Sequence, residues 1–280
     1  MCVFLYRFFC RDFSTQILSA LIMNIREKIR KSKPKIHVIS NNASLPFVVD
    51  SILALGAIPI AAISPMEVYE ITEGVDALLL NTGTPDNTRI KSYFLSLEAA
   101  KKKAIPLVLD PVACFSTGLR RDFIKKILRS ADRLVIRGNL REIYFLATGM
   151  ILSEADKGQS DIDSYAKIFS DFSKETGFIL AITGETDMAV SGERIEYINT
   201  GTPLLTKITG GGCMLSGVLT AALAADMDNS KTAEFDMTCE ALKFYGDSAL
   251  EAERKMKLSG HAGTETFRTF LIDELSEYYE

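Results

Sequence analysis

Short apolar runs alternate with longer amphipathic segments along most of the chain. The runs have the length of buried strands and are apolar at successive positions. Predicted strands lie at residues 36–39, 58–61, 77–80, 107–109, 133–136 and 178–182. Predicted helices lie between them at residues 47–55, 65–71, 87–103, 120–129 and 139–147. Strands apolar on both faces that alternate with helices predict an α/β fold with a mostly parallel sheet and helices on both faces.

The pattern changes after the last of these strands. Residues 187–190 and 193–197, separated by Ser191-Gly192, predict a hairpin at the edge of the sheet. Helices are expected at residues 213–225, 232–255 and 263–279, and a surface loop over the polar segment 149–161. No linker, repeat or low-complexity block interrupts the chain, so we expect a single domain over residues 23–280.

The first residues stand apart from this pattern. Residues 1–13 are aromatic and apolar, but Arg7 and Arg11 interrupt them. The segment is too short to span a bilayer and lacks the order of regions found in a secretory signal. Met23 opens a plausible beginning for a folded protein, so we expect residues 1–22 to be an extension outside the fold.

Composition and charge exclude several classes of protein. Apolar residues make up 47% of the chain and charged residues 24%, which permits a large core. The net charge of −4 comes from 36 acidic and 32 basic side chains and gives no electrostatic footprint for nucleic acid or a membrane. Two histidines are too few for a His-rich zinc site. The five cysteines show no C-x-x-C spacing, which favours a reducing compartment and predicts a cytoplasmic protein.

Polar residues follow the predicted strands at the edge where α/β proteins bind ligands. Asp110 ends the fourth strand, and Glu142 follows the fifth; one or two carboxylates with substrate phosphates are the usual way of holding Mg²⁺. Glu142 is also placed to complete a capping box with Asn139, and the two roles are compatible. Arg137 suits bidentate binding of a phosphate, with a surface salt bridge as the alternative.

The glycine run Gly210-Gly211-Gly212 before a predicted helix is the strongest local signal. Glycines let the backbone approach a ligand closely, and the helix N-terminus favours negative charge there. The run is neither a Walker A motif nor G-x-G-x-x-G, and tight packing alone could also require these glycines. Cys213 follows in the first helical turn, where the dipole favours a thiolate. The alternative for Cys213 is a small buried hydrophobic residue.

These motifs together resemble the hydroxyethylthiazole kinases, and the resemblance runs in order from about residue 24 to the C-terminus. The matching segments begin at Leu53, Asn81, Leu109, Ile136, Ala181 and Leu204. The resemblance implies a ribokinase-like, three-layer α/β/α fold. It also implies transfer of the γ-phosphate of ATP to the alcohol of 4-methyl-5-(2-hydroxyethyl)thiazole, with Mg²⁺, by a homotrimer with sites between subunits.

The resemblance also implies roles for single residues. Phosphoryl transfer depends on positioning and charge stabilisation more than on covalent help. The implied roles are ATP and phosphate binding for Arg137, Thr183, Gly211 and Gly212, thiazole binding for Gly210, Asn41 and Ala61, proton acceptance for Cys213, and metal binding for Asp110 and Glu142.

The chain departs from the family pattern mainly around the substrate. Ala61 stands where relatives commonly have methionine, Pro46 lies in an altered segment, and Phe115 lies in a loop that is usually glycine-rich. Two other functions stay open at this point. One is an NAD(P)H-hydrate dehydratase-like lyase on the same fold, although such enzymes carry aspartate in place of Cys213. The other is a thiazole-binding protein without turnover.

Overall fold

The computed structural model describes residues 25–152, 163–226, 228 and 230–277. The predicted extension at residues 1–22 lies outside these ranges, as does most of the predicted surface loop over residues 149–161.

A single eight-stranded sheet runs through the described residues in the order β2-β1-β3-β4-β5-β6-β7-β8. The strands from β2 to β6 are parallel, and β7 and β8 form an antiparallel hairpin at one edge. The strands are β1 (Lys35–Ile39), β2 (Ile58–Ile60), β3 (Ala77–Asn81), β4 (Leu107–Asp110), β5 (Leu134–Asn139), β6 (Ile179–Thr183), β7 (Asp187–Ser191) and β8 (Arg194–Ile198). The predicted α/β class, parallel sheet and edge hairpin are confirmed.

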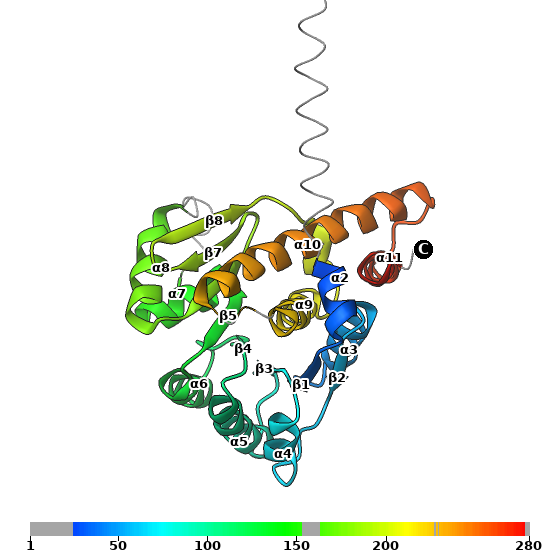
Figure 1. Ribbon diagram of the computed structural model, residues 1–280. Coiled ribbons are helices and arrows are strands. Elements are labelled where there is room, and N and C mark those ends of the chain that lie inside the picture. The colour runs from blue at the N-terminus through cyan, green and yellow to red at the C-terminus, as the bar shows by residue number, and fades with distance from the viewer. Residues whose placement is uncertain (1–24, 153–162, 227, 229, 278–280) are drawn as a thin grey trace, which may run out of the picture.

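Helices cover both faces of the sheet and make three layers (Figure 1). One face carries α2 (Ile25–Ser32), α3 (Leu45–Ala54), α9 (Gly211–Ala225), α10 (Lys231–Leu258) and α11 (Thr264–Ser276). The other carries α4 (Val68–Glu73), α5 (Asn87–Lys103), α6 (Gly118–Ser130), α7 (Leu140–Thr148) and α8 (Asp163–Thr176). Each face has its own apolar cluster, because the side chains of a buried strand point alternately to the two faces.

Two elements lie outside the predicted set. The short 3-10 helix η2 (Pro203–Lys207) precedes the glycine run, and α2 precedes β1. Ile29 of α2 is fully buried, and the Arg26 guanidinium donates to the carbonyl of Glu274 at 2.5 Å. Contacts with residues near the C-terminus therefore hold α2 in place, and the local sequence pattern does not predict these contacts.

The helix α9 positions the site. It is apolar on nearly all sides and almost completely buried, as expected for a helix enclosed by other elements. It packs against the sheet between α3 and α10 (Figure 1). Its N-terminus therefore meets the carboxyl ends of β3 and β4. Among the described residues, no helix has the length and hydropathy needed to cross a membrane.

Candidate active site

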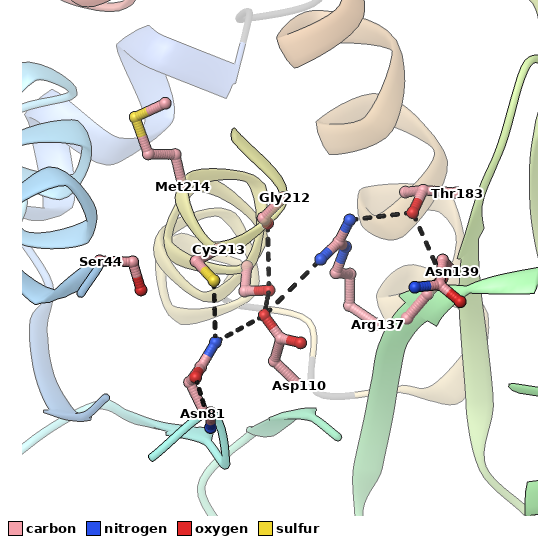
Figure 2. Close-up of polar contacts among 12 residues, drawn as sticks. Ser44, Asn81, Asp110, Arg137, Asn139, Thr183, Gly212, Cys213 and Met214 are labelled. Carbon is pink, nitrogen blue, oxygen red and sulfur yellow. Dashed lines mark hydrogen bonds and ion pairs between the residues drawn. The ribbon is translucent and has the colours of Figure 1, made fainter. Parts of the chain in front are cut away.

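Asp110 lies at the centre of a buried polar network (Figure 2). It ends β4, and the register of the sheet pairs it with Asn81, which ends β3. The Asn81 side-chain amide donates to Asp110 Oδ2 at 2.7 Å, and the Ser216 hydroxyl on α9 donates to the same oxygen at 2.9 Å. Burial raises the pKa of Asp110, while Arg137 and these hydrogen bonds oppose that shift.

Asn81 connects Asp110 to Cys213. The backbone N–H of Gly83 donates to Asn81 Oδ1 at 3.1 Å, and an N–H group can only donate. The side-chain amide nitrogen must therefore face the opposite way, toward Asp110 and toward Cys213 Sγ, which lies 3.1 Å from it. Its two hydrogens are thus directed at the carboxylate and the sulfur.

Asn41 extends this network from the end of β1. Its side-chain oxygen accepts from the backbone N–H groups of Ala43 and Ser44, each at 3.0 Å. Its nitrogen then faces Asn81 Oδ1 at 2.8 Å and the Ser44 hydroxyl at 2.5 Å. The structure thus brings the predicted substrate residue Asn41 into the network that holds Cys213.

Arg137 joins three elements at the other side of Asp110. Its guanidinium lies 3.6 Å from Asp110 Oδ2 and donates to the Thr183 hydroxyl on β6 at 2.9 Å. Arg137 is 9% exposed and Asp110 is 1% exposed. The alternative of a surface salt bridge for Arg137 is therefore wrong, because this ion pair is buried.

The glycine run forms a tight turn against these groups. Gly210 precedes α9 with φ of +80°, the left-handed conformation that favours glycine. A Cβ atom on Gly212 would lie 2.5 Å from the Arg137 guanidinium nitrogens. The backbone of the turn therefore lies directly against the arginine, and a side chain at Gly212 would require the guanidinium to shift.

The Cys213 thiol is half-buried beside the carboxylate of Asp110. Burial raises its pKa, and the charge of Asp110 adds to that rise, while hydrogen bonds from Ser44 and Asn81 and the charge of Arg137 act the other way. The predicted effect of the helix dipole, which favours a thiolate, is therefore opposed. The sequence pattern places Asp110 far away along the chain, and only the fold brings it next to the thiol.

Glu142 is held by backbone groups. Its side chain and that of Asn139 form the predicted capping box at the start of α7. One carboxylate oxygen accepts from the Asn139 N–H at 2.9 Å and the other from the Ala113 N–H at 2.8 Å. Burial raises its pKa, and the negative charge of Asp110 raises it further.

Not every predicted residue lies in the network. Ala61 is exposed, directly after the edge strand β2. Phe115 packs edge-to-face on Phe145 of α7, with ring centroids 6.2 Å apart. In the part of the chain that the structure describes, no three His, Cys, Asp or Glu side chains gather as a closed metal cage would require.

No role was predicted for Asn81, Ser216 and Arg120, which also belong to the site. Asn81 could have been found as the polar residue that ends an otherwise apolar strand, and Ser216 from its position one helical turn after Cys213. Arg120 carries no such signal. Its guanidinium donates to the carbonyls of Thr82 and Val112, each at 2.7 Å, and so joins the loops after β3 and β4.

Comparison with known proteins points to one family. The model of the hydroxyethylthiazole kinase family matches residues 26–280. A protein named hydroxyethylthiazole kinase from Shouchella clausii is 35% identical over 251 residues, which cover 89% of this chain and 93% of that protein. The solved structure of a hydroxyethylthiazole kinase protein from Pyrococcus horikoshii superposes with a TM-score of 0.78 and 28% identity, over 93% of this chain and 94% of that one.

More distant structures share the fold alone. A ribokinase-like superfamily protein from Enterococcus faecalis superposes with a TM-score of 0.58 and 12% identity, over 90% of this chain and 89% of that one. The ADP/ATP-dependent NAD(P)H-hydrate dehydratase of Bacillus subtilis reaches a TM-score of 0.54 at 11% identity, over 91% and 98% of the two chains. The predicted ribokinase-like fold is confirmed, and the lyase alternative is not favoured.

Proposed function

This chain belongs to the hydroxyethylthiazole kinase family, and we propose that it transfers the γ-phosphate of ATP to the hydroxyl group of 4-methyl-5-(2-hydroxyethyl)thiazole. The observation that carries the proposal is the convergence of Arg137, Asp110 and Cys213 on the glycine turn at the N-terminus of α9. Anion-binding backbone, a fixed cation, a carboxylate and a proton acceptor are the groups that phosphoryl transfer to an alcohol needs.

Arg137 and the glycine turn bind the polyphosphate. The first N–H groups of a helix have no partner within it, and in α9 the first internal bond runs from Met214 N–H to the Gly210 carbonyl. The N–H groups of Gly211 and Gly212 therefore belong to the set that can donate to phosphate oxygens. Thr183 orients the Arg137 guanidinium from β6.

Cys213 accepts the proton of the alcohol. Its sulfur lies at the same helix N-terminus and is oriented by Asn81. A loose transition state requires the proton to leave only late, so a weak base suffices. Because burial and Asp110 raise the thiol pKa, the thiolate fraction at neutral pH is small.

Asp110 and Glu142 suit a magnesium ion. Burial raises the pKa of Glu142 and the charge of Asp110 adds to the rise, and a divalent cation would offset that repulsion. Asn81, Ser216 and Arg137 all contact Oδ2 of Asp110, so Oδ1 is the oxygen that would face the ion. When bound, Mg²⁺ supplies positive charge to the phosphate oxygens.

The thiazole binds beside Gly210 and Asn41. A Cβ atom on Gly210 would meet Ser44 at 3.0 Å and the Phe47 ring at 3.5 Å, so these side chains form the wall next to the turn. Ala61, which is exposed beside the edge strand, becomes part of the pocket in a homotrimer with sites between subunits. We place this assembly in the cytoplasm, and we assign residues 23–280 of each chain to a single domain.

Measurement of ADP release across a panel of small primary alcohols tests the function. We expect the thiazole alcohol to give the highest kcat/KM, and we expect no ATP-dependent dehydration of hydrated NADH. Dehydration of hydrated NADH without any alcohol-dependent release of ADP would establish the lyase. Tight binding of the thiazole without ADP release would establish a non-catalytic binding protein.

A further inference from the structure

The hydroxyl group of Tyr245 contacts the backbone of the glycine turn at the carbonyl of Gly211. Tyr245 lies on α10 and is 2% exposed, and its hydroxyl oxygen lies 2.6 Å from the carbonyl oxygen of Gly211, which is also buried. A carbonyl can only accept a hydrogen bond, so the hydroxyl donates. Burial raises the pKa of Tyr245, which keeps this donor protonated.

This hydrogen bond constrains the next N–H group along the chain. The carbonyl of Gly211 and the N–H of Gly212 belong to one planar peptide unit and point in opposite directions. A donor that fixes the oxygen therefore fixes the direction of the N–H. The Gly212 N–H lies before Met214, whose N–H makes the first internal bond of α9, and so it is one of the groups directed out of the helix end.

This peptide lies in the first turn of α9, where Gly211 packs against the Leu205 carbonyl and Gly212 against the Arg137 guanidinium. Its glycine residues have no side chains, and glycine has the widest choice of backbone conformations. The helix α10 itself is firmly seated here, because Gly246, next to Tyr245, packs directly against Thr200. A buried side chain of α10 thus adds a hydrogen bond to a peptide that joins two glycines.

We propose that Tyr245 is a positioning residue of the phosphoryl-transfer site: its hydroxyl holds the Gly211–Gly212 peptide so that the Gly212 N–H faces the transferring phosphoryl group. The inference rests on the proposed function, because it names what this N–H meets. Tyr245 acts through the backbone and does not touch the reacting atoms. It belongs to no motif that the sequence singles out.

The sequence allows a direct observation of this peptide. Of the 18 glycines, only Gly211 and Gly212 follow another glycine. In protein labelled with ¹³C-carbonyl, ¹⁵N-glycine, an NMR spectrum that correlates each amide with the preceding carbonyl carbon contains signals from these two residues only. The Gly212 signal reports the Gly211 carbonyl that accepts from Tyr245.

Tyr245→Phe removes the hydroxyl and keeps the ring. We expect the Gly212 signal to move, and its response to a non-hydrolysable imido analogue of ATP to be lost. We expect kcat to fall about 2- to 10-fold, the range for one neutral hydrogen bond, with less change in the KM for the alcohol. Tyr165→Phe is the matched control, because Tyr165 is buried in the cluster on the other face of the sheet. It should leave the signal and kcat unchanged.

Three results would overturn the inference: an unmoved Gly212 signal in Tyr245→Phe, a moved signal with wild-type kcat, or the same loss in both variants. Wild-type protein that releases no ADP with the alcohol would refute the proposed function instead. In that case the response of the Gly212 signal to the ATP analogue still decides the inference, because it should be present in wild type and absent in Tyr245→Phe.

Discussion

Arg137→Ala should weaken both the fold and ATP use, because Arg137 is the buried partner of Asp110. The guanidinium lies 3.6 Å from Asp110 Oδ2, and both side chains are at least nine-tenths buried. Removal of the arginine leaves the buried carboxylate without its cation. The change therefore tests whether the arginine has a structural role in addition to binding phosphate.

The size of the effect follows from this geometry. Breaking a buried ion pair by removing one partner costs about 3–5 kcal/mol of unfolding free energy. That is a large share of the roughly 5–15 kcal/mol that stabilises a typical protein. Asp110→Asn in the same chain removes the uncompensated charge and keeps its size. The double variant should therefore recover at least about 2 kcal/mol of the loss in Arg137→Ala.

Urea unfolding at neutral pH measures these differences, with Arg121→Ala as the control. Arg121 is an exposed arginine on α6, and its removal should change the unfolding free energy by less than about 0.5 kcal/mol. Independently, the kcat/KM for ATP should fall in Arg137→Ala by roughly 10-fold or more, the effect of a hydrogen bond to a charged group. If Arg137→Ala unfolds like wild type, or if Asp110→Asn gives no recovery, the buried pair does not carry the stability assigned to it here.

Three further predictions concern the base, a titrating carboxylate and the N-terminus. Cys213→Ala should lower kcat by about 10²-fold, the lower end for a general base, and a wild-type rate would show that the thiol only packs. Cys213→Asp should stay active but lose the increase of kcat at alkaline pH, which the wild-type enzyme shows because the pKa of its thiol is raised. Burial raises the pKa of Asp187 to about 6, above its value in the unfolded chain, so the free energy of unfolding falls as pH rises from about 4 to 6. In urea unfolding, Asp187→Asn should be more stable than wild type by roughly 1–3 kcal/mol at pH 7 and equal to it near pH 3.5, and an equal gain at both pH values would contradict this. A chain that starts at Met23 should match the full chain in thermal unfolding and ADP release, and a loss in either would show that residues 1–22 support the fold.

The fold could be predicted where local signals agree with tertiary packing. The helix α5 occupies residues 87–103 as predicted, because Asp86 caps its first turn and lysines occupy its last. The helix α4 starts at Val68, three residues later than predicted, because residues 64–67 form a turn in which Glu67 and Val68 N–H groups bond to the Ser64 carbonyl. The helix α2 was missed because its support comes from α11, far along the chain.

The site could be predicted residue by residue, but its connections could not. The rule that ligands bind at the carboxyl ends of parallel strands selects Asp110 and Arg137 without any structure. The same rule leaves Asn81 without a role, because the two groups to which its side-chain amide donates, Asp110 and Cys213, are 29 and 132 residues away in the chain. The expectation of a thiolate at Cys213 rested on the local helix dipole. The carboxylate of Asp110 disfavours the thiolate, and only the folded sheet brings this carboxylate close to the thiol.

The glycine turn shows why a local motif and its surroundings must be considered together. From the sequence, three glycines indicate either conformational freedom or close packing, and the two explanations appear as alternatives. In the structure they apply to different residues. Gly210 needs its freedom, with φ of +80°, whereas at Gly212 the Arg137 guanidinium occupies the space of a Cβ atom. The backbone of the turn and the arginine are therefore fitted to each other. A side chain at Gly212 would displace the Arg137 guanidinium from Asp110. The glycine at this position therefore serves both the anion-binding turn and the buried ion pair.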